Sequence, residues 1–487
     1  MTHEGSQKVS LFSGSFLILF GAALLALSLV FGDGPDGPSS AADGEPALGG
    51  VAEGDEKNLV LIKLESVGAR AVGAYNDRAA SDGLTPFLDG LAEDSLVAEQ
   101  AYTTIPHTGK AVVSATCGVY APPHTLSSEA EKGAVGVPCL PEMLRREGYE
   151  IARFSPPRAP APPDVPGGGS YRNENMGYRD SDTRPEVGSE GYDLVSYFSY
   201  EDRTMLEPTA GWLEERDSSE PFFATYNTGS AHHPYGAVPE GGPEEYVEDP
   251  TMNRYLNSVR YLDGFLADLF EEYRRAGEYE DTVFVLYGDH GEAFGEHEDP
   301  GGEPLTQHDG VLYEETVRVP LMVHTPGEEG YEDRTGRLAS ITDILPTAAE
   351  ALGYEMRGGG AYSGHPLTDL PRQRTLYLSC WPPGQCLGAV NSRGEKYIRY
   401  LDEPRGQGTE YYDLPRDGAE RENLLAGEDA SGVGGTLSRW LGSSPEERAR
   451  EIWSGVLRWY SRLAQAAKVR SGDSGGAREK DRGADDG

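Results

Sequence analysis

Positive charge, and lysine in particular, is what this sequence has little of. Its 487 residues include 42 Lys and Arg against 81 Asp and Glu, a net charge of −39, and only 8 of the basic residues are Lys. This balance argues against a basic surface that could bind the phosphate backbone of DNA or RNA, so we expect no nucleic-acid partner. Abundant carboxylates with scarce lysine also indicate adaptation to high salt, in which repulsion between like charges is screened.

Cysteine is also scarce, and its four residues fall into two pairs that are close in sequence. The pairs are Cys117 with Cys139 and Cys380 with Cys386. In a chain that faces an oxidising compartment such pairs form disulfides, so we predict two disulfide bonds. The alternative is four unpaired buried thiols, as in a cytosolic protein.

Charge is absent from Leu11–Phe31, a long and largely apolar run near the start of the sequence. At about 1.5 Å per residue, a helix of this length crosses a hydrocarbon layer of roughly 30 Å. The run is longer than most secretory signals, and no convincing Ala-x-Ala cleavage site follows it. We predict a transmembrane anchor over residues 1–32, with a cleaved signal as the alternative. The large remainder of the chain is then periplasmic or extracellular.

The rest of the chain divides by composition. Residues 33–57 are rich in Gly, Pro, Ala and acidic side chains without periodicity, which indicates a disordered linker. From Thr375 onward, short strand-like segments alternate with turns, as is typical of a small antiparallel sheet. We therefore assign 58–370 to a catalytic domain, 371–470 to a C-terminal subdomain with a helix, and 471–487 to a disordered tail.

Metal-ligating side chains follow two apolar segments that read as core strands. Thr282–Tyr287 is a run of apolar, aromatic and β-branched residues, and Asp289 and His290 come just after it. Asn58–Leu64 is a second such strand and ends at Glu65. The carboxyl ends of strands in open α/β sheets are where ligands bind, and these side chains suit a divalent cation. For the Asp–His pair alone, the simpler interpretation is a polar turn.

A third segment supplies a hydroxyl and a cation at the start of a helix. His107–Lys110 leads into a helix predicted over Ala111–Cys117. Helix N–H groups with Lys110 can hold a tetrahedral anion, which would place Thr108 beside both the anion and the metal. The alternative is a capped helix with a surface lysine. A further strand, Pro221–Tyr226, leads to His232 and its neighbour His233 at the same sheet edge.

In their order along the chain, these segments resemble the sulfatases of the alkaline-phosphatase superfamily. The resemblance runs from Asn58 to Leu425. It is carried by NLVLIKLES, TPFLDGLAEDS, YTTIPHTGK…CGVY, SAHHPY, YGDHGEAFGEH, QHDGVLYEETVRVPLMV, TDILPTAAEALG and EYYDLPRDGAERENLL. It implies an α/β fold: a large mixed-sheet domain followed by a small four-stranded antiparallel subdomain. The predicted transmembrane helix precedes both.

The resemblance also implies roles for individual residues. It assigns one divalent metal ion (Zn, Mn, Mg or Ca) to Glu65, Asp289 and His290, with Thr108 completing the shell as the nucleophile. It also assigns contact with the transferred group to His232 and His308, which Lys110 would join from the helix start described above. The sulfatase Cys-x-Pro-Ser-Arg stretch is absent, because Lys110 and Val112 stand at its Pro and Arg positions. Formylglycine therefore cannot form at Thr108.

Together these features predict a metal-dependent hydrolase that cleaves a sulfate or phosphate ester through a covalent Thr108 intermediate. The partner would be a sulfated or phosphorylated small molecule, glycan or lipid, and the N-terminal helix would contact the membrane. Two alternatives stay open. One is a membrane-anchored transferase of the phosphoglycerol or phosphoethanolamine type, and the other is an inactive binding module on the same fold.

Overall fold

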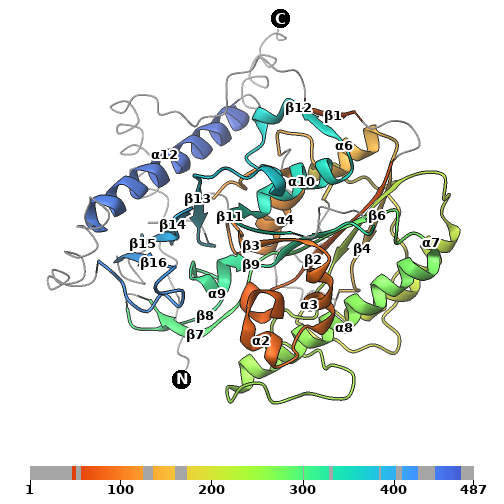
Figure 1. The fold of residues 1–487 in the computed structure, drawn as a ribbon, viewed down its shortest axis with the longest axis horizontal. Helices are drawn as coiled ribbons and strands as arrows, with labels where there is room; N and C mark the ends of the chain where they lie inside the picture. The colour runs from red at the N-terminus through yellow and green to blue at the C-terminus, as the bar shows by residue number, and fades with distance from the viewer. Residues whose placement is uncertain are drawn as a thin grey trace, which may run out of the picture.

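A mixed β-sheet forms the centre of the larger part of the molecule (Figure 1). The computed structural model describes residues 46–50, 56–123, 135–158, 173–299, 301–327, 333–382, 385–401, 408–425 and 445–472. In sheet order the strands are β11 (Arg334–Ser340), β3 (Leu96–Tyr102), β10 (Leu321–His324), β6 (Thr282–Gly288), β2 (Asn58–Leu64), β5 (Phe222–Asn227) and β4 (Glu150–Phe154). Strands β6, β2, β5 and β4 are mutually parallel, whereas β10 runs antiparallel to both of its neighbours.

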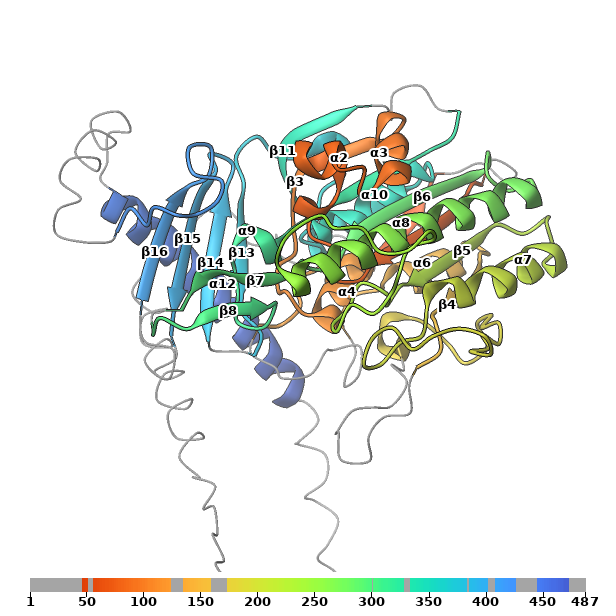
Figure 2. The ribbon, with the colours of Figure 1, turned by 90° about the horizontal axis from the view of Figure 1, so that it is seen from below.

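Helices cover both faces of this sheet, because successive side chains of its strands point to opposite sides. Leu59 and Leu61 of β2 belong to one core, and Val60 and Ile62 belong to the other. The first core is completed by α4 (Thr108–Cys117), α6 (Leu140–Arg146) and α10 (Ile344–Ala351). The second is completed by α3 (Pro86–Glu93), α7 (Leu206–Glu215) and α8 (Pro250–Ala276), with α2 (Asp77–Ser81) beside α3 (Figures 1 and 2).

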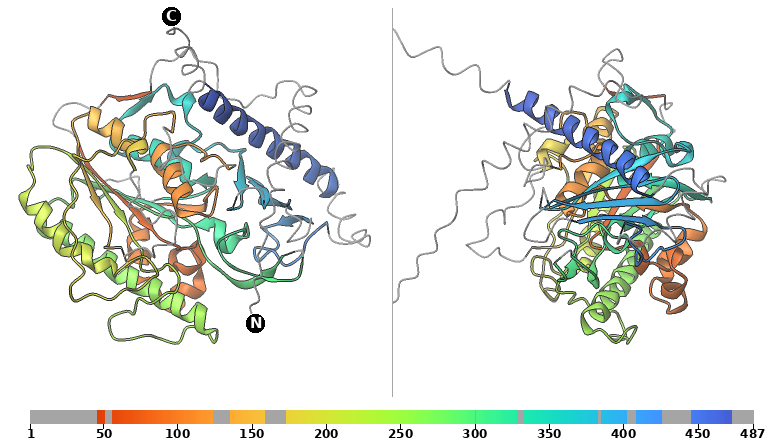
Figure 3. Two further views of the ribbon diagram at one scale, coloured as in Figure 1. Left: turned by 180° about the vertical axis from the view of Figure 1, so that it is seen from behind. Right: turned by 90° about the vertical axis from the view of Figure 1, so that its left-hand side faces the viewer.

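A second, smaller sheet lies at one end of the large one, as predicted (Figure 2). Its four antiparallel strands are β13 (Thr375–Ser379), β14 (Cys386–Asn391), β15 (Glu395–Tyr400) and β16 (Gly408–Asp413). Helix α12 (Pro445–Gly472) crosses one face of this sheet (Figure 3). Val456 and Trp459 of the helix pack on Leu387 and Ala389 of β14, which gives the small sheet its own core.

Short segments connect β6 to β10 along the chain. Strands β7 (Ala293–Glu298) and β8 (Pro304–Gln307) form a hairpin after β6, and α9 (Glu314–Val317) follows it. The extended segment 318–324 is divided into β9 (Arg318–Val319) and β10. Pro320 separates the two pieces, because proline has no N–H for a ladder hydrogen bond.

Part of the predicted linker is ordered, so that prediction is wrong for Ala47–Gly49. These residues form β1, which pairs antiparallel with β12 (Glu355–Arg357). Leu48 is buried and belongs to the first core. The hydrophobic free energy gained by this burial offsets the conformational entropy lost when the segment is ordered. The predicted anchor, Leu11–Phe31, lies outside the described residues. Within the described ranges, no helix combines the length and apolar character that crossing a bilayer requires.

Both predicted disulfide bonds are present. Cys117 at the end of α4 is bonded to Cys139 at the start of α6, and Cys380 after β13 is bonded to Cys386 at the start of β14. The first bond joins two helices of the large domain, and the second closes a short loop of the small subdomain. The predicted thiol alternative is therefore wrong.

Asp263 of α8 offers a test of how the helices are joined. Its carboxylate accepts hydrogen bonds from the backbone N–H groups of Phe87 at 3.1 Å and Leu88 at 2.9 Å, in the first turn of α3. Asp263→Ala should lower the free energy of unfolding by about 1–3 kcal/mol, because two helix N–H groups lose their acceptor. Glu271→Ala, on an exposed side of the same helix, should change it by less than about 0.5 kcal/mol. Equal effects in denaturant unfolding would contradict this account of α3.

His297 of β7 predicts a pH dependence of stability at the contact between hairpin and small subdomain. Its Nδ1 lies 2.8 Å from Glu315 Oε1, and its Nε2 lies 3.2 Å from the carbonyl oxygens of Ala419 and Glu420. Burial opposes protonation, but Glu315 raises the pKa of His297 overall. A raised folded pKa stabilises the protein below about pH 6.5, and this contribution is lost as the pH rises through the folded pKa.

The wild type should therefore exceed His297→Gln in free energy of unfolding by more at pH 6 than at pH 9. Denaturant titrations at both pH values measure this difference. His365→Gln is the control, because burial lowers the pKa of that imidazole and its contribution has the opposite sign. A difference between wild type and His297→Gln that does not change with pH would contradict the role given to the His297–Glu315 pair.

Candidate active site

The predicted metal ligands meet because β2 and β6 are adjacent, parallel and in register. Leu64, the last residue of β2, is paired with Gly288, the last residue of β6. Glu65 and Asp289 therefore leave the sheet at the same edge. A Cβ on Gly288 would lie 2.2 Å from the carbonyl oxygen of Val67, so only glycine permits this close approach.

Asp289 is held by the backbone around it. Its Oδ1 accepts hydrogen bonds from the N–H groups of Ser66 and His290, each at 2.9 Å. The other carboxylate oxygen, Oδ2, lies 3.8 Å from His290 Nε2. Asp289 is fully buried. Because both of these hydrogen bonds are accepted by Oδ1, Oδ2 is the oxygen that is available to a metal ion beside His290.

Glu65, Asp289 and His290 form a buried group with the geometry of a cation site. One ligand atom from each residue lies within 4.8 Å of the other two, and His290 Nε2 is 3.7 Å from Glu65 Oε1. His290 Nδ1 lies 3.1 Å from the carbonyl oxygen of Gly291, which assigns the proton to Nδ1 and leaves the Nε2 lone pair for a ligand. Two carboxylates and one neutral imidazole fit a divalent cation.

The electrostatics of the three ligands agree with this assignment. Burial, reinforced by the charge of His308, lowers the pKa of His290 to about 3, so its imidazole is neutral near pH 7. Burial next to Glu65 raises the pKa of Asp289 to about 6. Burial acts in the same direction on Glu65, but the ammonium of Lys63 lowers the pKa of that carboxyl overall. Both carboxylates are therefore ionised at neutral pH.

Thr108 lies against this group at the start of α4. The helix begins at Thr108 and not at Ala111 as predicted, so the hydroxyl is in the first turn. Thr108 Oγ1 donates to Glu65 Oε1 at 3.0 Å and is 3.4 Å from His290 Nε2. The hydroxyl is thus directed at the ligand atoms, and the positive end of the helix dipole lies behind it.

Lys110 is buried and directed elsewhere. Its Nζ donates to the carbonyl oxygen of Pro122 at 2.8 Å and lies 5.7 Å from the centre of the Trp381 ring. The role assigned to it from the sequence, contact with the transferred group, remains a prediction. The ring of Trp381 also packs on His107, with 4.1 Å between ring centres, so the small subdomain contacts the residue that precedes Thr108.

His308 and His232, predicted to contact the transferred group, lie beside the ligand group. The His308 ring stacks on His290 with 3.8 Å between centres, and its Nδ1 is 3.1 Å from Glu292 Oε1. Burial opposes protonation, but Glu292 raises the pKa of His308 to about 9, so this imidazole is positively charged at neutral pH. The His232 ring centre lies 6.1 Å from that of His308. A doubly protonated imidazole donates hydrogen bonds and protons to an anionic ligand.

Two residues of the site escaped prediction. Lys63 contacts both Glu65 and Asp289, and its only signal in the sequence is its position as the one charged residue in the apolar segment NLVLIKL. Glu292 pairs with His308 across 16 residues, and no local pattern predicts that contact. Glu292 does lie two residues after His290, close enough to the ligand pair to have been considered.

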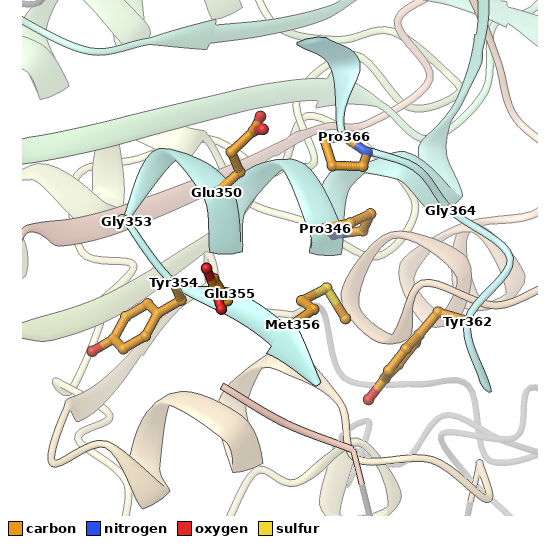
Figure 4. A pocket seen from close by; sticks show the side chains of 9 residues that line it. All are labelled: Pro346, Glu350, Gly353, Tyr354, Glu355, Met356, Tyr362, Gly364 and Pro366. Carbon is orange, nitrogen blue, oxygen red and sulfur yellow. The ribbon is translucent and has the colours of Figure 1, made fainter. Parts of the chain in front are cut away.

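A cavity in the described part of the chain lies away from this group. It has a volume of about 620 Å³ and lies along α10 and β12, where none of the predicted site residues contributes to its walls (Figure 4). Its lining residues are Pro346, Glu350, Gly353, Tyr354, Glu355, Met356, Tyr362, Gly364 and Pro366. The chemistry-bearing side chains therefore gather at the sheet edge and not in this cavity.

Comparison with curated proteins places the chain beside bacterial lipoteichoic acid synthases. Lipoteichoic acid synthase 2 of Bacillus subtilis is 25% identical over 327 residues, which cover 63% of this chain and 46% of that protein. The lipoteichoic acid synthase of Staphylococcus saprophyticus is 24% identical over 323 residues, covering 62% and 46%. The chain thus matches about half the length of these relatives.

Solved structures share the fold. A lipoteichoic acid synthase of Listeria monocytogenes has a TM-score of 0.56 at 19% identity and covers 75% of this chain and 90% of its own. The phosphonate monoester hydrolase of Agrobacterium radiobacter has a TM-score of 0.54 at 16% identity, covering 81% and 96%. These likenesses support the α/β architecture with its small antiparallel sheet.

A model of the Sulfatase family matches residues 57–354, which is more than half of the chain. The matched region begins before β2 and extends past β6, and it therefore includes Glu65, Thr108, Asp289 and His290. The protein belongs to the sulfatase family of the alkaline-phosphatase superfamily.

Proposed function

We propose that this protein is a metal-dependent enzyme that cleaves a phosphate ester through a covalent intermediate on Thr108 and passes the phosphoryl group to an acceptor. One observation carries the proposal. The Thr108 hydroxyl lies 3.0 Å from Glu65 Oε1 and 3.4 Å from His290 Nε2. Glu65 and His290 form a potential metal-binding group together with Asp289. A hydroxyl becomes a strong nucleophile in such surroundings.

Glu65, Asp289 and His290 would hold one divalent cation, with the Thr108 hydroxyl beside it. When bound, the cation lowers the pKa of a hydroxyl group and offsets the negative charge of a phosphate. The geometry supports a preorganised site, because the hydrogen bond that Asp289 Oδ1 accepts from Ser66 and the one that His290 Nδ1 donates to Gly291 fix the orientation of these two ligands.

The chain's own residues then account for the transfer step. Thr108 Oγ1 gives its proton to water and attacks phosphorus, so that a bond from Oγ1 to phosphorus forms and the bond to the leaving oxygen breaks. His308, positively charged and held by Glu292, gives a proton to that leaving oxygen. His232 lies near enough to His308 to contact the equatorial oxygens. A hydroxyl of the acceptor, or water, then gives its proton to the neutral His308 and attacks phosphorus. The bond from phosphorus to Thr108 Oγ1 breaks, and Oγ1 regains a proton from water.

Phosphate is preferred over sulfate as the transferred group for a chemical reason. The resemblance places Thr108 where sulfatases carry the cysteine that becomes formylglycine, and threonine cannot undergo that conversion. The relatives named lipoteichoic acid synthases favour the transferase alternative over simple hydrolysis. The complete ligand set argues against an inactive binding module. With the anchor predicted over Leu11–Phe31, we place the reaction on the outer face of a membrane.

Thr108→Ala should lower turnover by about a thousandfold or more, because the nucleophile is removed. Bound metal, measured by elemental analysis, should be retained in this variant, since the other ligands are intact. Thr108→Ser should keep measurable activity, and Thr116→Ala on the same helix should resemble the wild type. Near-normal turnover by Thr108→Ala would show that Thr108 is not the nucleophile.

The substrate class is tested with the full-length protein in detergent and three chromogenic esters. Bis(p-nitrophenyl) phosphate should be cleaved at least about tenfold faster than p-nitrophenyl sulfate, with p-nitrophenyl phosphate as the monoester comparison. Adding glycerol as an acceptor should produce a glycerol phosphate ester in proportion to its concentration. Faster turnover of the sulfate would contradict the choice of phosphate. Hydrolysis alone, with no glycerol ester, would contradict the transferase and leave a hydrolase.

A further inference from the structure

Lys63 is a buried cation at the centre of the site that the proposed chemistry does not use. It is the penultimate residue of β2, it is 4% exposed, and its side chain reaches the catalytic edge of the sheet. Its Nζ hydrogen bonds to Glu65 Oε2 and lies 3.5 Å from Asp289 Oδ2 and 3.4 Å from the carbonyl oxygen of Thr228. All three of these partners are oxygen atoms.

The two carboxylates are thus shared between two cation positions. Glu65 turns Oε1 toward Thr108 and His290, and it turns Oε2 toward Lys63. Asp289 uses Oδ1 for backbone N–H groups, so Oδ2 faces both Lys63 and His290. One position is bounded by Thr108 and His290, and the ammonium of Lys63 fills the other.

The position that Lys63 fills has the chemistry of a cation site in its own right. Two carboxylate oxygens and a backbone carbonyl oxygen are the ligands that hard divalent cations take in proteins. Without a cation in this position, the two buried carboxylates would repel each other where only the metal position offers a positive charge. Such repulsion is costly in a low-dielectric interior. The lysine supplies that cation permanently, because it is covalently part of β2.

A second group of ligand atoms, from His290, Glu292 and His308, does not offer the same opportunity. Glu292 is already paired with His308 at 3.1 Å. The group also needs His290 Nε2, because His290 Nδ1 is directed at the carbonyl oxygen of Gly291. An ion there would compete with the first triad for one nitrogen atom.

We infer that Lys63 is a built-in cation that occupies a second cation position and limits this centre to one divalent ion. The inference rests on the metal site of the proposed function. The charges of the two carboxylates and one divalent ion sum to zero. The ammonium of Lys63 then gives the metal site a net charge of one positive unit, which favours an anionic substrate. Lys63 acts through the ligands it contacts and is a positioning residue.

The test is the number of Mn²⁺ ions bound per full-length chain, measured by calorimetric titration after removal of metal with a chelator. The wild type should bind one equivalent and Lys63→Met two, because the oxygen cradle loses its ammonium while keeping its volume. Electron paramagnetic resonance of the loaded variant should show two coupled ions, which two-metal sites hold about 3.5–4 Å apart. Mn²⁺ should also raise the melting temperature of the variant more than that of the wild type.

Lys396→Met is the matched control. Lys396 is equally buried and also bridges two carboxylates, Glu314 at 3.0 Å and Glu420 at 2.9 Å, but these belong to the contact with the small sheet. This variant should bind one equivalent of Mn²⁺, like the wild type. If Lys63→Met does not fold, which circular dichroism would reveal, Lys63→Gln enters the same titration with the same expected stoichiometry.

The outcomes separate the inference from the proposed function. One equivalent in both the wild type and the folded Lys63 variant would overturn the inference and leave the single-metal enzyme intact. Two equivalents in the wild type would also overturn it. No Mn²⁺ bound by the wild type would overturn the metal centre itself. Two equivalents in Lys396→Met would show that the loss of any buried lysine creates a metal site. The role assigned to Lys63 would then be contradicted.

Discussion

The parallel pairing of β2 with β6 is the constraint on which the rest of the site depends. The two strands are in register from Asn58 opposite Thr282 to Leu64 opposite Gly288. Because side chains alternate along a strand, a slip of one residue would turn Glu65 and Asp289 away from each other. Burial on both faces prevents that slip, since it would also exchange the side chains of the two cores. The same strand register therefore determines both the packing of the two cores and the positions of Glu65 and Asp289.

Much of this arrangement could be predicted because it is local. The strand Asn58–Leu64 has the bounds expected from its apolar run, and the ligands follow their strands directly. Contacts between distant segments could not be predicted, such as the pairing of Glu292 with His308. A lone lysine in a core strand does not reveal which buried carboxylates it meets. The direction of Lys110, toward a loop carbonyl, depends on how its helix packs.

The charge of the centre stands in contrast to that of the whole protein. A net charge of −39 repels anions, and salt reduces this repulsion over distances beyond about 10 Å. The phosphate-bearing substrate that we propose would therefore depend on the cations of the site itself. The described residues supply these as the ammonium of Lys63 and the imidazolium of His308, each held by a buried carboxylate.

The most direct test of the central claim is an anomalous difference map from crystals of the protein grown with Mn²⁺. The account predicts one strong peak at the carboxyl ends of β2 and β6, bonded to Glu65, Asp289 and His290 and within reach of the Thr108 hydroxyl. A peak bonded to Glu292 and His308 without Glu65, or no peak at this edge of the sheet, would contradict it.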